Sequence, residues 1–228
     1  MQLSPLTSQL ESSRGHRQLS EKVANRIREA VMVGELRDGF LRTERLAEDL
    51  GVSQTPVREA LMILHAEGTV QWEPRRGFRL LPMTREDVED LYDVHAYIAG
   101  ELAARAATTM TAAEVDRLEV IQAELEEANR TGNVELIDRL NHEIHRAINI
   151  SSGSVKMAHL LRQTVRYLPL GFFGRIEGWA DASAHDHAPI FLALREGSRD
   201  RARKAMVEHI HHIGELLVDH LKSQDVLK

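Results

Sequence analysis

The segment 51–61, which reads GVSQTPVREAL, constrains the fold of this chain more than any other feature. Gly51 suits a tight turn, because glycine adopts backbone angles that other residues avoid. Ser53 or Thr55 can cap a helix that follows, and Pro56 fits the first turn of that helix. Apolar side chains then recur at the spacing of one helical face, at Val57, Ala60, Leu61 and Leu64. The segment therefore predicts a turn followed by an amphipathic helix.

A second helix precedes this turn. The apolar residues of 43–50 fall on one side of a helix, so helix, glycine turn and helix together predict a helix-turn-helix. Gln54, Arg58 and His65 lie off the apolar stripe of the second helix. Exposed side chains of the second helix in such a motif enter the major groove of DNA. We therefore expect this helix to read DNA.

These residues resemble the DNA-binding domain of the GntR family of bacterial transcription regulators, in which the turn and recognition helix commonly read GVSRTPVREAL. The chain continues MILHAEGTVQWEPRRGFRLLP, which resembles the leucine-rich stretch, Glu-Gly pair and basic hairpin wing of that family. The resemblance implies a winged helix-turn-helix domain over residues 19–82. It also implies DNA contacts from Ser53, Gln54, Thr55, Arg58, Arg75, Arg76 and Gly77.

One position departs from the family pattern, because Gln54 stands where most members have arginine. Arginine pairs as a fork with guanine, whereas glutamine pairs better with adenine. The departure predicts a shifted operator preference, with DNA binding retained.

The charge of the chain is uneven along its length. The net charge of −6 by itself disfavours a nucleic-acid binder. Residues 1–82 nevertheless carry 12 Lys and Arg against 11 Asp and Glu, whereas the remainder carries 17 against 24. Binding of operator DNA then depends on a local basic patch and on pairing two such domains in a homodimer. The patch consists of Arg58, Arg75, Arg76 and Arg79.

Composition excludes several other classes of protein. No apolar run is long enough to cross a bilayer, and the N-terminus lacks the pattern of a secretory signal. The chain has no cysteine, which excludes disulfides, thiol catalysis and zinc–thiolate sites. We expect a cytoplasmic protein with no membrane partner.

The pattern along the chain predicts a mainly α fold. Residues 1–18 are polar and without periodicity, which is typical of a flexible arm. A helix is expected from Ser20 to Gly34, and the wing strands from Val70 to Trp72 and from Phe78 to Leu81. The remainder predicts an all-α antiparallel helical bundle, with helices at 84–109, 111–130, 133–150, 154–168, 184–196 and 198–223.

Local signals mark the ends of these helices. Thr84 with Asp87 and Thr111 with Glu114 have the spacing of capping boxes, and Gly132 and Gly197 stand at the C-terminal ends of two helices. The apolar, glycine-rich segment 169–182 allows two interpretations. It is either a helix extension broken at Gly171 or a loop covering a cavity.

Helix geometry sorts the twelve histidines by face. At about 100° per residue, His209 lies at the centre of the apolar face of the last helix, and His187 lies on the apolar face of the helix before it. Asp138 and His142 are neighbours on one face of an earlier helix, in a stripe that also holds Asn141 and His145. A single inward histidine is most often a hydrogen-bonded core residue. Several converging imidazoles and a carboxylate instead favour a divalent cation, because burying them unpaired is costly.

The same residues are similar to the metal-binding pattern of the FCD domain, the helical effector domain of the FadR subfamily of GntR regulators. The resemblance spans about residues 84–222 and implies that residues 83–228 form an effector-binding and dimerisation domain. It implies a metal held by Asp138, His142, His187 and His209, with zinc, nickel and manganese as candidates and a small carboxylate bound beside it. The donor set alone does not identify the metal.

The effector contacts are less well marked. Family members carry an Arg and a Glu after a D-L-Y-x-V stretch, whereas this chain has DLYDV followed by His95, with Ala99 at the Glu position. Candidate effector contacts are His95, Arg166 and Tyr167.

Three functions fit these observations. The first is a transcription regulator, expected to be a repressor, whose operator affinity responds to a small carboxylate or sugar acid. The second is a metal-dependent enzyme that uses the His/Asp cluster, although the sequence offers no separate nucleophile or general base beside it. In the third, the metal is only a structural staple of the bundle.

Overall fold

The computed structural model describes residues 16–37, 39–166 and 172–228, and these residues form two compact units. The N-terminal unit contains the described residues up to Thr84, together with Arg166 and Leu221–Lys228. The second unit contains residues 85–165 and 172–220. The division after Thr84 lies close to residue 82, where the sequence predicts the boundary.

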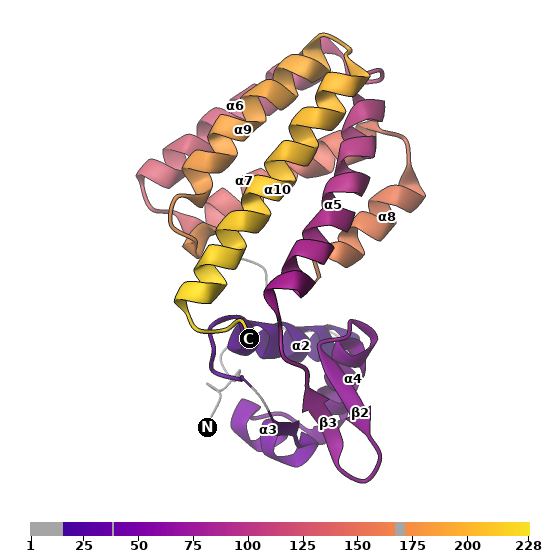
Figure 1. Cartoon of the computed structure of the whole chain (residues 1–228), viewed down its shortest axis with the longest axis vertical. Coiled ribbons are helices and arrows are strands. Elements are labelled where there is room, and N and C mark those ends of the chain that lie inside the picture. Colours follow the sequence, from indigo (N-terminus) through magenta and orange to yellow (C-terminus); the bar gives the residue numbers. More distant parts are fainter. Residues whose placement is uncertain (1–15, 38, 167–171) are drawn as a thin grey trace. The chain divides into compact units, whose positions relative to one another are not determined.

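The described part of the N-terminal unit is a winged helix-turn-helix, as predicted (Figure 1). Its helices are α2 (His16–Met32), α3 (Thr43–Leu50) and α4 (Gln54–Ala66). Its strands are β1 (Phe40–Leu41), β2 (Val70–Glu73) and β3 (Gly77–Leu80). Helix α2 begins at His16, so the last residues of the predicted arm 1–18 are helical. Residues 1–15 of that arm lie outside the described residues.

The turn between α3 and α4 depends on one glycine. Gly51 has a left-handed φ of 68°, and the N–H of the next residue, Val52, donates to the carbonyl of Ala47 at 3.0 Å. This hydrogen bond closes the end of α3, and only glycine adopts such a φ without strain. Ser53 takes the cap position of α4 with extended backbone, but its side chain makes no capping hydrogen bond. The predicted side-chain cap is therefore wrong at Ser53, whereas Pro56 is buried in the first turn as expected.

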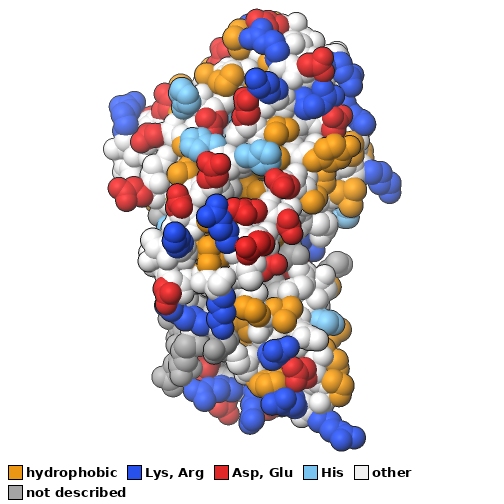
Figure 2. All heavy atoms as spheres, in the orientation of Figure 1, with side chains coloured by type: hydrophobic (Ala, Val, Ile, Leu, Met, Phe, Trp, Pro, Cys, Tyr) orange, Lys and Arg blue, Asp and Glu red, His pale blue; other side chains and the backbone are white. Residues whose placement is uncertain are grey.

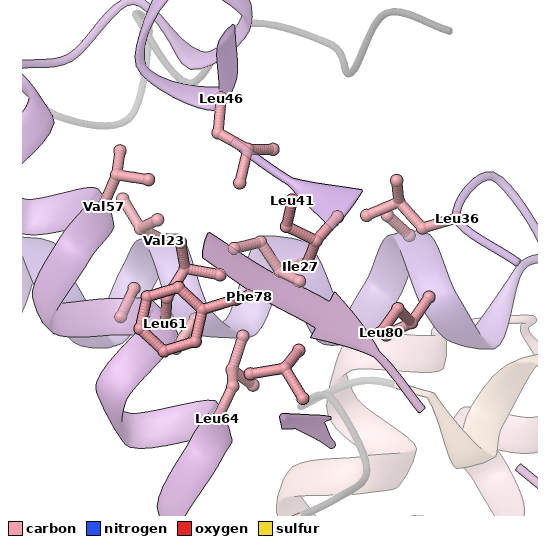
Figure 3. Packing of buried hydrophobic residues seen from close by; sticks show 14 of the residues in the cluster. Val23, Ile27, Leu36, Leu41, Leu46, Val57, Leu61, Leu64, Phe78 and Leu80 are labelled. Carbon is pink, nitrogen blue, oxygen red and sulfur yellow. The ribbon is translucent and has the colours of Figure 1, made fainter. Parts of the chain in front are cut away.

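One hydrophobic core holds the N-terminal unit together (Figure 3). Val23 and Ile27 from α2 meet Leu61 and Leu64 from α4, and Phe78 of β3 lies against them. All five side chains are at most 2% exposed. Because burial of one large apolar side chain contributes about 1.5–3 kcal/mol, this packing fixes which face of α4 points inward. The opposite face of α4 is left to solvent.

The wing is a small antiparallel sheet with the strand order β1-β3-β2. Strands β2 and β3 form the predicted hairpin, with Trp72 opposite Phe78. Strand β1 pairs with β3 on its other edge and is absent from the prediction. It comprises only two residues, so it offers no alternation of apolar and polar side chains to recognise.

The second unit is an antiparallel helical bundle, as predicted (Figure 1). Its elements are α5 (Arg85–Ala106), α6 (Ala112–Arg130), α7 (Val134–Ser151), α8 (Val155–Thr164), the 3-10 helix η1 (Phe173–Arg175), α9 (Trp179–Arg195) and α10 (Arg199–Ser223). Helix α6 packs against α7 and α9, whereas α5 packs against α7 and α8. None of the described helices is both long enough and apolar enough to span a membrane.

Several helix ends follow the sequence signals. Thr111 and Glu114 form a reciprocal capping box at the start of α6. Gly132 and Gly197 have left-handed φ values of 68° and 67° just after α6 and α9. The capping box and the two C-terminal glycines are therefore confirmed.

The sequence allows two interpretations of the segment 169–182, and the described part of it, residues 172–182, is partly helical. Helix α9 begins at Trp179, five residues before the predicted start at 184. Trp179 is only 2% exposed and stacks on Phe173 of η1, with ring centroids 5.4 Å apart. Its burial against η1 is a tertiary contact that local sequence patterns do not report. Gly171 lies outside the described residues.

Two glycines allow α5 and α10 to lie close together. A Cβ atom on Gly100 of α5 would come within 2.7 Å of the Val207 side chain of α10. A Cβ atom on Gly214 of α10 would come equally close to the ring of Tyr92 on α5. Val207 of α10 thus contacts the backbone of α5 at Gly100, and Tyr92 of α5 contacts the backbone of α10 at Gly214.

A buried ion pair in the N-terminal unit provides a stability test. The Arg28 guanidinium donates to both carboxylate oxygens of Glu67 at 2.6 and 3.0 Å, and the two side chains are 4% and 9% exposed. We expect Glu67→Ala to lower the unfolding free energy of this unit by about 3–5 kcal/mol, because it leaves a buried charge without its carboxylate. Hydrogen exchange of the α2 and α4 amides measures the loss.

Glu89→Ala is the matched control for this test. Glu89 pairs with Arg85 at 2.6 Å, but both side chains are about half exposed. Loss of such a surface pair costs less than about 1 kcal/mol. Equally small effects of the two substitutions, each measured in its own unit, would contradict the importance of the Arg28–Glu67 pair.

Candidate DNA-binding surface and metal centre

The exposed face of α4 carries the side chains that the sequence assigns to DNA. Ser53, Gln54, Thr55 and Arg58 are all exposed, whereas Val57, one residue before Arg58, is fully buried. Arg58 makes no hydrogen bond or ion pair with any residue that the structure describes. Its guanidinium is therefore available to a phosphate or a base edge.

The wing tip presents further cations. Arg75 and Arg76 are exposed, and Arg75 has a left-handed φ of 66°. The Arg76 guanidinium lies 4.3 Å from the ring centroid of Phe40 and 3.4 Å from Glu73. Gly77 is half-buried and has a φ of 98°. Figure 2 shows Lys and Arg side chains at the end of the N-terminal unit where Figure 1 draws this hairpin.

Three histidines meet inside the bundle. His145 of α7, His187 of α9 and His209 of α10 each offer a ring nitrogen, and the three nitrogens lie within 4.8 Å of one another. The rings of His145 and His209 are stacked with centroids 5.2 Å apart, and the centroid of His187 lies 4.8 Å from that of His209. His187 and His209 are almost completely buried, whereas His145 is half-buried. We call these residues the histidine cluster.

Hydrogen bonds to other side chains fix the orientation of two rings in the cluster. The Nδ1 atom of His187 donates to Gln122 Oε1 at 2.8 Å, while the amide of Gln122 donates to Glu126 at 3.1 Å. The Nδ1 atom of His209 donates to Asp186 Oδ2 at 3.3 Å. Because Nδ1 carries a proton in both rings, Nε2 is the nitrogen left to face the cluster, and in the neutral ring of His187 it keeps its lone pair. The Nε2 atom of His209 lies 3.3 Å from Nε2 of His145.

Burial keeps the rings of His145 and His187 neutral. It lowers the pKa of both His145 and His187 well below the ordinary value, and the neighbouring imidazole of His209 lowers both further. Burial alone would raise the pKa of Asp186, but its hydrogen bonds with His209 and His212 outweigh this effect and hold the pKa low. Neutral imidazoles held by an ionised carboxylate are the protonation states that metal ligation needs.

One spacing in the cluster, that between the Nε2 atoms of His145 and His209, fits a divalent metal, whereas the three nitrogens together spread over as much as 4.8 Å. Two lone pairs facing each other repel, so the nitrogens of His145 and His209 need a proton or a cation between them. Two nitrogens bound tetrahedrally to zinc at about 2.0–2.1 Å lie about 3.3–3.4 Å apart. The distance between these nitrogens is 3.3 Å. The cluster can therefore hold a metal, and its donor set does not identify which one.

The structure brings together only part of the predicted ligand set. His187 and His209 meet as predicted, but His142 is exposed and lies outside the cluster. Asp138 is half-buried, and its Oδ1 atom accepts a hydrogen bond from the N–H of Gly174 at 3.2 Å. His145, which the predicted ligand set did not include, is the third histidine of the cluster in place of His142.

Helix geometry explains the exchange of histidines. The apolar arc of α7 contains Ile137, Leu140, Ile144 and Ile148. At about 100° per residue, His142 lies about 155° from the centre of this arc, whereas His145 lies only about 95° from it. His145 thus lies at the edge of the buried face of α7, closer to it than His142 does. Gln122, the hydrogen-bond partner of His187, carried no comparable signal in the sequence.

The candidate effector residues are dispersed. His95 lies in the bundle, where its Nδ1 atom is 3.0 Å from the hydroxyl of Thr164 and its ring stacks on Tyr92. Burial, together with the imidazole of His209, lowers the pKa of His95 to about 4. Arg166 is half exposed in the N-terminal unit, 3.2 Å from Glu21. Tyr167 lies outside the described residues.

Two family models match the chain. Residues 19–80 match the family of bacterial regulatory proteins called gntR, and residues 90–212 match the FCD domain. The transcriptional regulator YdhC of Bacillus subtilis is 26% identical over 82% of this chain and 86% of its own length. The regulator McbR of Escherichia coli is 24% identical over 85% and 90%, respectively.

Solved structures have the same fold. The structure of E. coli McbR covers 88% of this chain and 97% of its own, with a TM-score of 0.65 and 22% identity. A GntR regulator from Rhodococcus covers the same shares, with a TM-score of 0.59 and 20% identity.

The fold and these matches define a DNA-binding transcription regulator rather than an enzyme. The chain belongs to the GntR family, in the FadR-like group whose winged helix-turn-helix is followed by an FCD domain.

Burial of His95 predicts a pH-dependent stability of the bundle. Its folded pKa of about 4 lies below the ordinary value of 6.5, so between these values the unfolded chain binds a proton that the folded chain does not. The contribution of His95 to the unfolding free energy is therefore fully present above about pH 6.5. It falls as the pH drops toward 4, by at most about 1.4 kcal/mol per pH unit.

The variant His95→Gln should remove the contribution of His95 to the pH dependence of the unfolding free energy, measured by urea unfolding of the metal-free protein. Thr164→Val is the control, because it removes the hydroxyl partner and keeps the imidazole, so the slope should remain. An unchanged slope in His95→Gln would show that His95 does not contribute to it.

Proposed function

We propose that this regulator is a homodimeric, cytoplasmic repressor whose affinity for operator DNA responds to a small carboxylate or sugar acid bound beside a divalent metal in the bundle. The observation that carries the proposal is the convergence of three ring nitrogens from His145, His187 and His209 in the FCD domain. Neutral imidazoles inside a bundle are costly unless they find a common partner. A metal with open coordination positions supplies that partner and also accepts an oxygen ligand.

The DNA-binding part of the proposal assigns a role to each exposed residue of α4 and the wing. Ser53, Gln54 and Thr55 lie at the N-terminal end of α4, which meets base edges in a helix-turn-helix. Arg58 contacts phosphate or a base, and Arg75, Arg76 and Gly77 contact DNA as the tip of the wing. In a dimer the two α4 helices would address half-sites about one helical turn, roughly 34 Å, apart.

The effector part rests on the surroundings of the histidine cluster. We propose His187, His209 and His145 as metal ligands, with Asp138 and His142 of α7 as further candidates from the family pattern. When bound, the metal supplies a Lewis-acidic position for a carboxylate oxygen. His95, Arg166 and Tyr167 remain the candidate effector contacts, and His95 is the one supported by its place in the bundle. Response to the effector requires different affinities for two arrangements of the protein, a coupling of about 1–3 kcal/mol.

The DNA-binding role predicts a specific, salt-sensitive complex that depends on Arg58. Arg58→Ala removes a charge-assisted contact, and we expect it to weaken operator binding about 5- to 150-fold in fluorescence anisotropy, since a bidentate contact is worth about 1–3 kcal/mol. Arg105→Ala replaces an exposed arginine of the bundle and is the control. If Arg58→Ala binds the operator as tightly as the parent chain, α4 is not the recognition helix.

The metal role predicts that Gln122 tunes metal affinity. Gln122→Leu frees Nδ1 of His187 from its acceptor, and we expect 10- to 100-fold weaker binding of zinc or nickel in calorimetric titrations. Gln122→Glu keeps an oxygen acceptor and should retain most of the affinity. Equal metal affinity in parent and Gln122→Leu would remove Gln122 from the site.

Chelation of the metal separates the regulatory role from the structural one. A thermal-shift screen of small carboxylates and sugar acids is run with and without metal, and circular dichroism follows the helix content. Loss of the carboxylate response with retained helices supports regulation. Loss of the helices on chelation supports a purely structural role of the metal instead.

A further inference from the structure

The exposed face of α4 contains an apolar side chain that the DNA contacts above do not use. Met62 is 52% exposed, whereas its neighbours Leu61 and Leu64 are fully buried. The buried residues Val57, Ala60, Leu61 and Leu64 define the inward direction of α4. At about 100° per residue, Met62 lies within about 30° of the outward direction, which is opposite to it. Thr55 lies within about 10° of that same direction. Met62 therefore projects from the middle of the face that carries Thr55.

Other large side chains near Met62 turn to partners of their own. His65 lies along the same side of α4, but its Nδ1 atom is 3.0 Å from the carbonyl of Val70 on β2. The carboxylate of Glu59 accepts a hydrogen bond from the hydroxyl of Ser20 on α2. Both side chains are thus engaged with the domain itself. Among the described residues of α4 that follow Arg58, Met62 is the large side chain that projects from the exposed face.

A recognition helix whose axis follows the major groove would keep Met62 within the same groove. Met62 follows Thr55 by seven residues, which is about 10 Å along the helix axis. This rise corresponds to about three base-pair steps at roughly 3.4 Å each. A helix whose first turn reads base edges therefore carries Met62 over base pairs farther along the same half-site.

The chemistry of the groove limits what a thioether can recognise. The C5-methyl group of thymine is the apolar group on the base edges of the major groove. A methionine placed over guanine or cytosine would instead cover acceptors or a donor without pairing with them. Methionine is flexible and polarizable, so it adapts to a methyl group without exact positioning.

We propose that Met62 is a specificity-determining residue that contacts a thymine methyl group in the operator half-site. The inference rests on α4 being the DNA-reading helix. It adds a thymine to the adenine preference that Gln54 predicts, so the half-site contains A·T pairs about three to four steps apart.

The test removes one methyl group from the DNA at a time. Randomised duplexes are selected on the full-length protein, and each thymine of the selected sequence is then replaced singly by deoxyuridine, which lacks the C5-methyl group. We expect one position per half-site at which binding by the parent chain weakens about fourfold, the effect of one buried methyl. Met62→Ala should bind the thymine and uracil forms of that position equally.

A matched control keeps the result specific to Met62. Val33→Ala shortens another apolar side chain of the same unit, 40% exposed, and should keep the fourfold response. Circular dichroism and gel filtration of all variants check folding and oligomeric state.

The outcomes separate this proposal from the proposed function. If the parent chain is insensitive to every thymine replacement while Arg58→Ala still weakens specific binding, α4 reads DNA and the role of Met62 is overturned. A Met62→Ala variant that keeps the uracil response, or that changes only its oligomeric state, also overturns it. If Arg58→Ala binds as tightly as the parent chain, the failure lies in the recognition helix itself.

Discussion

The candidate metal centre depends on two hydrogen bonds, one at the Nδ1 atom of each of two buried imidazoles. Gln122 and Asp186 hold the Nδ1 atoms of His187 and His209, and this fixes which ring nitrogen carries a proton. Without those acceptors the rings would be free to rotate and their lone pairs would not converge. The arrangement accounts for the burial of Gln122 in a largely apolar interior. It also means that the residues that prepare the site are as important as those that form it.

Helix α4 uses its two faces for different tasks. The inward face packs on Val23, Ile27 and Phe78, so the angle of the helix is set by the core rather than by DNA. The outward face then carries Gln54, Arg58 and Met62 without contributing to that packing. Such a division allows side chains on the outer face to change, as Gln54 has relative to the family pattern, while the fold stays intact.

Much of this organisation is predictable from the sequence, because strong periodicity and capping signals specify the helices. The recognition helix, the wing hairpin and the capping box at Thr111 all follow from such local patterns. Strand β1 and the early start of α9 at Trp179 depend on tertiary pairing, which local patterns do not contain. The candidate metal site was predicted in part. The family motif directed attention to His142, although the angular position of His145 was readable from the same helix.

The close contact of α5 and α10 has a mechanical consequence. At Gly100 and Gly214 no side chain separates the two helices from their neighbour's Val207 and Tyr92, so neither helix has slack in which to slide alone. His209 is carried by α10 and His95 by α5. Any displacement of α10 at His209 would therefore have to carry α5, with His95, along with it.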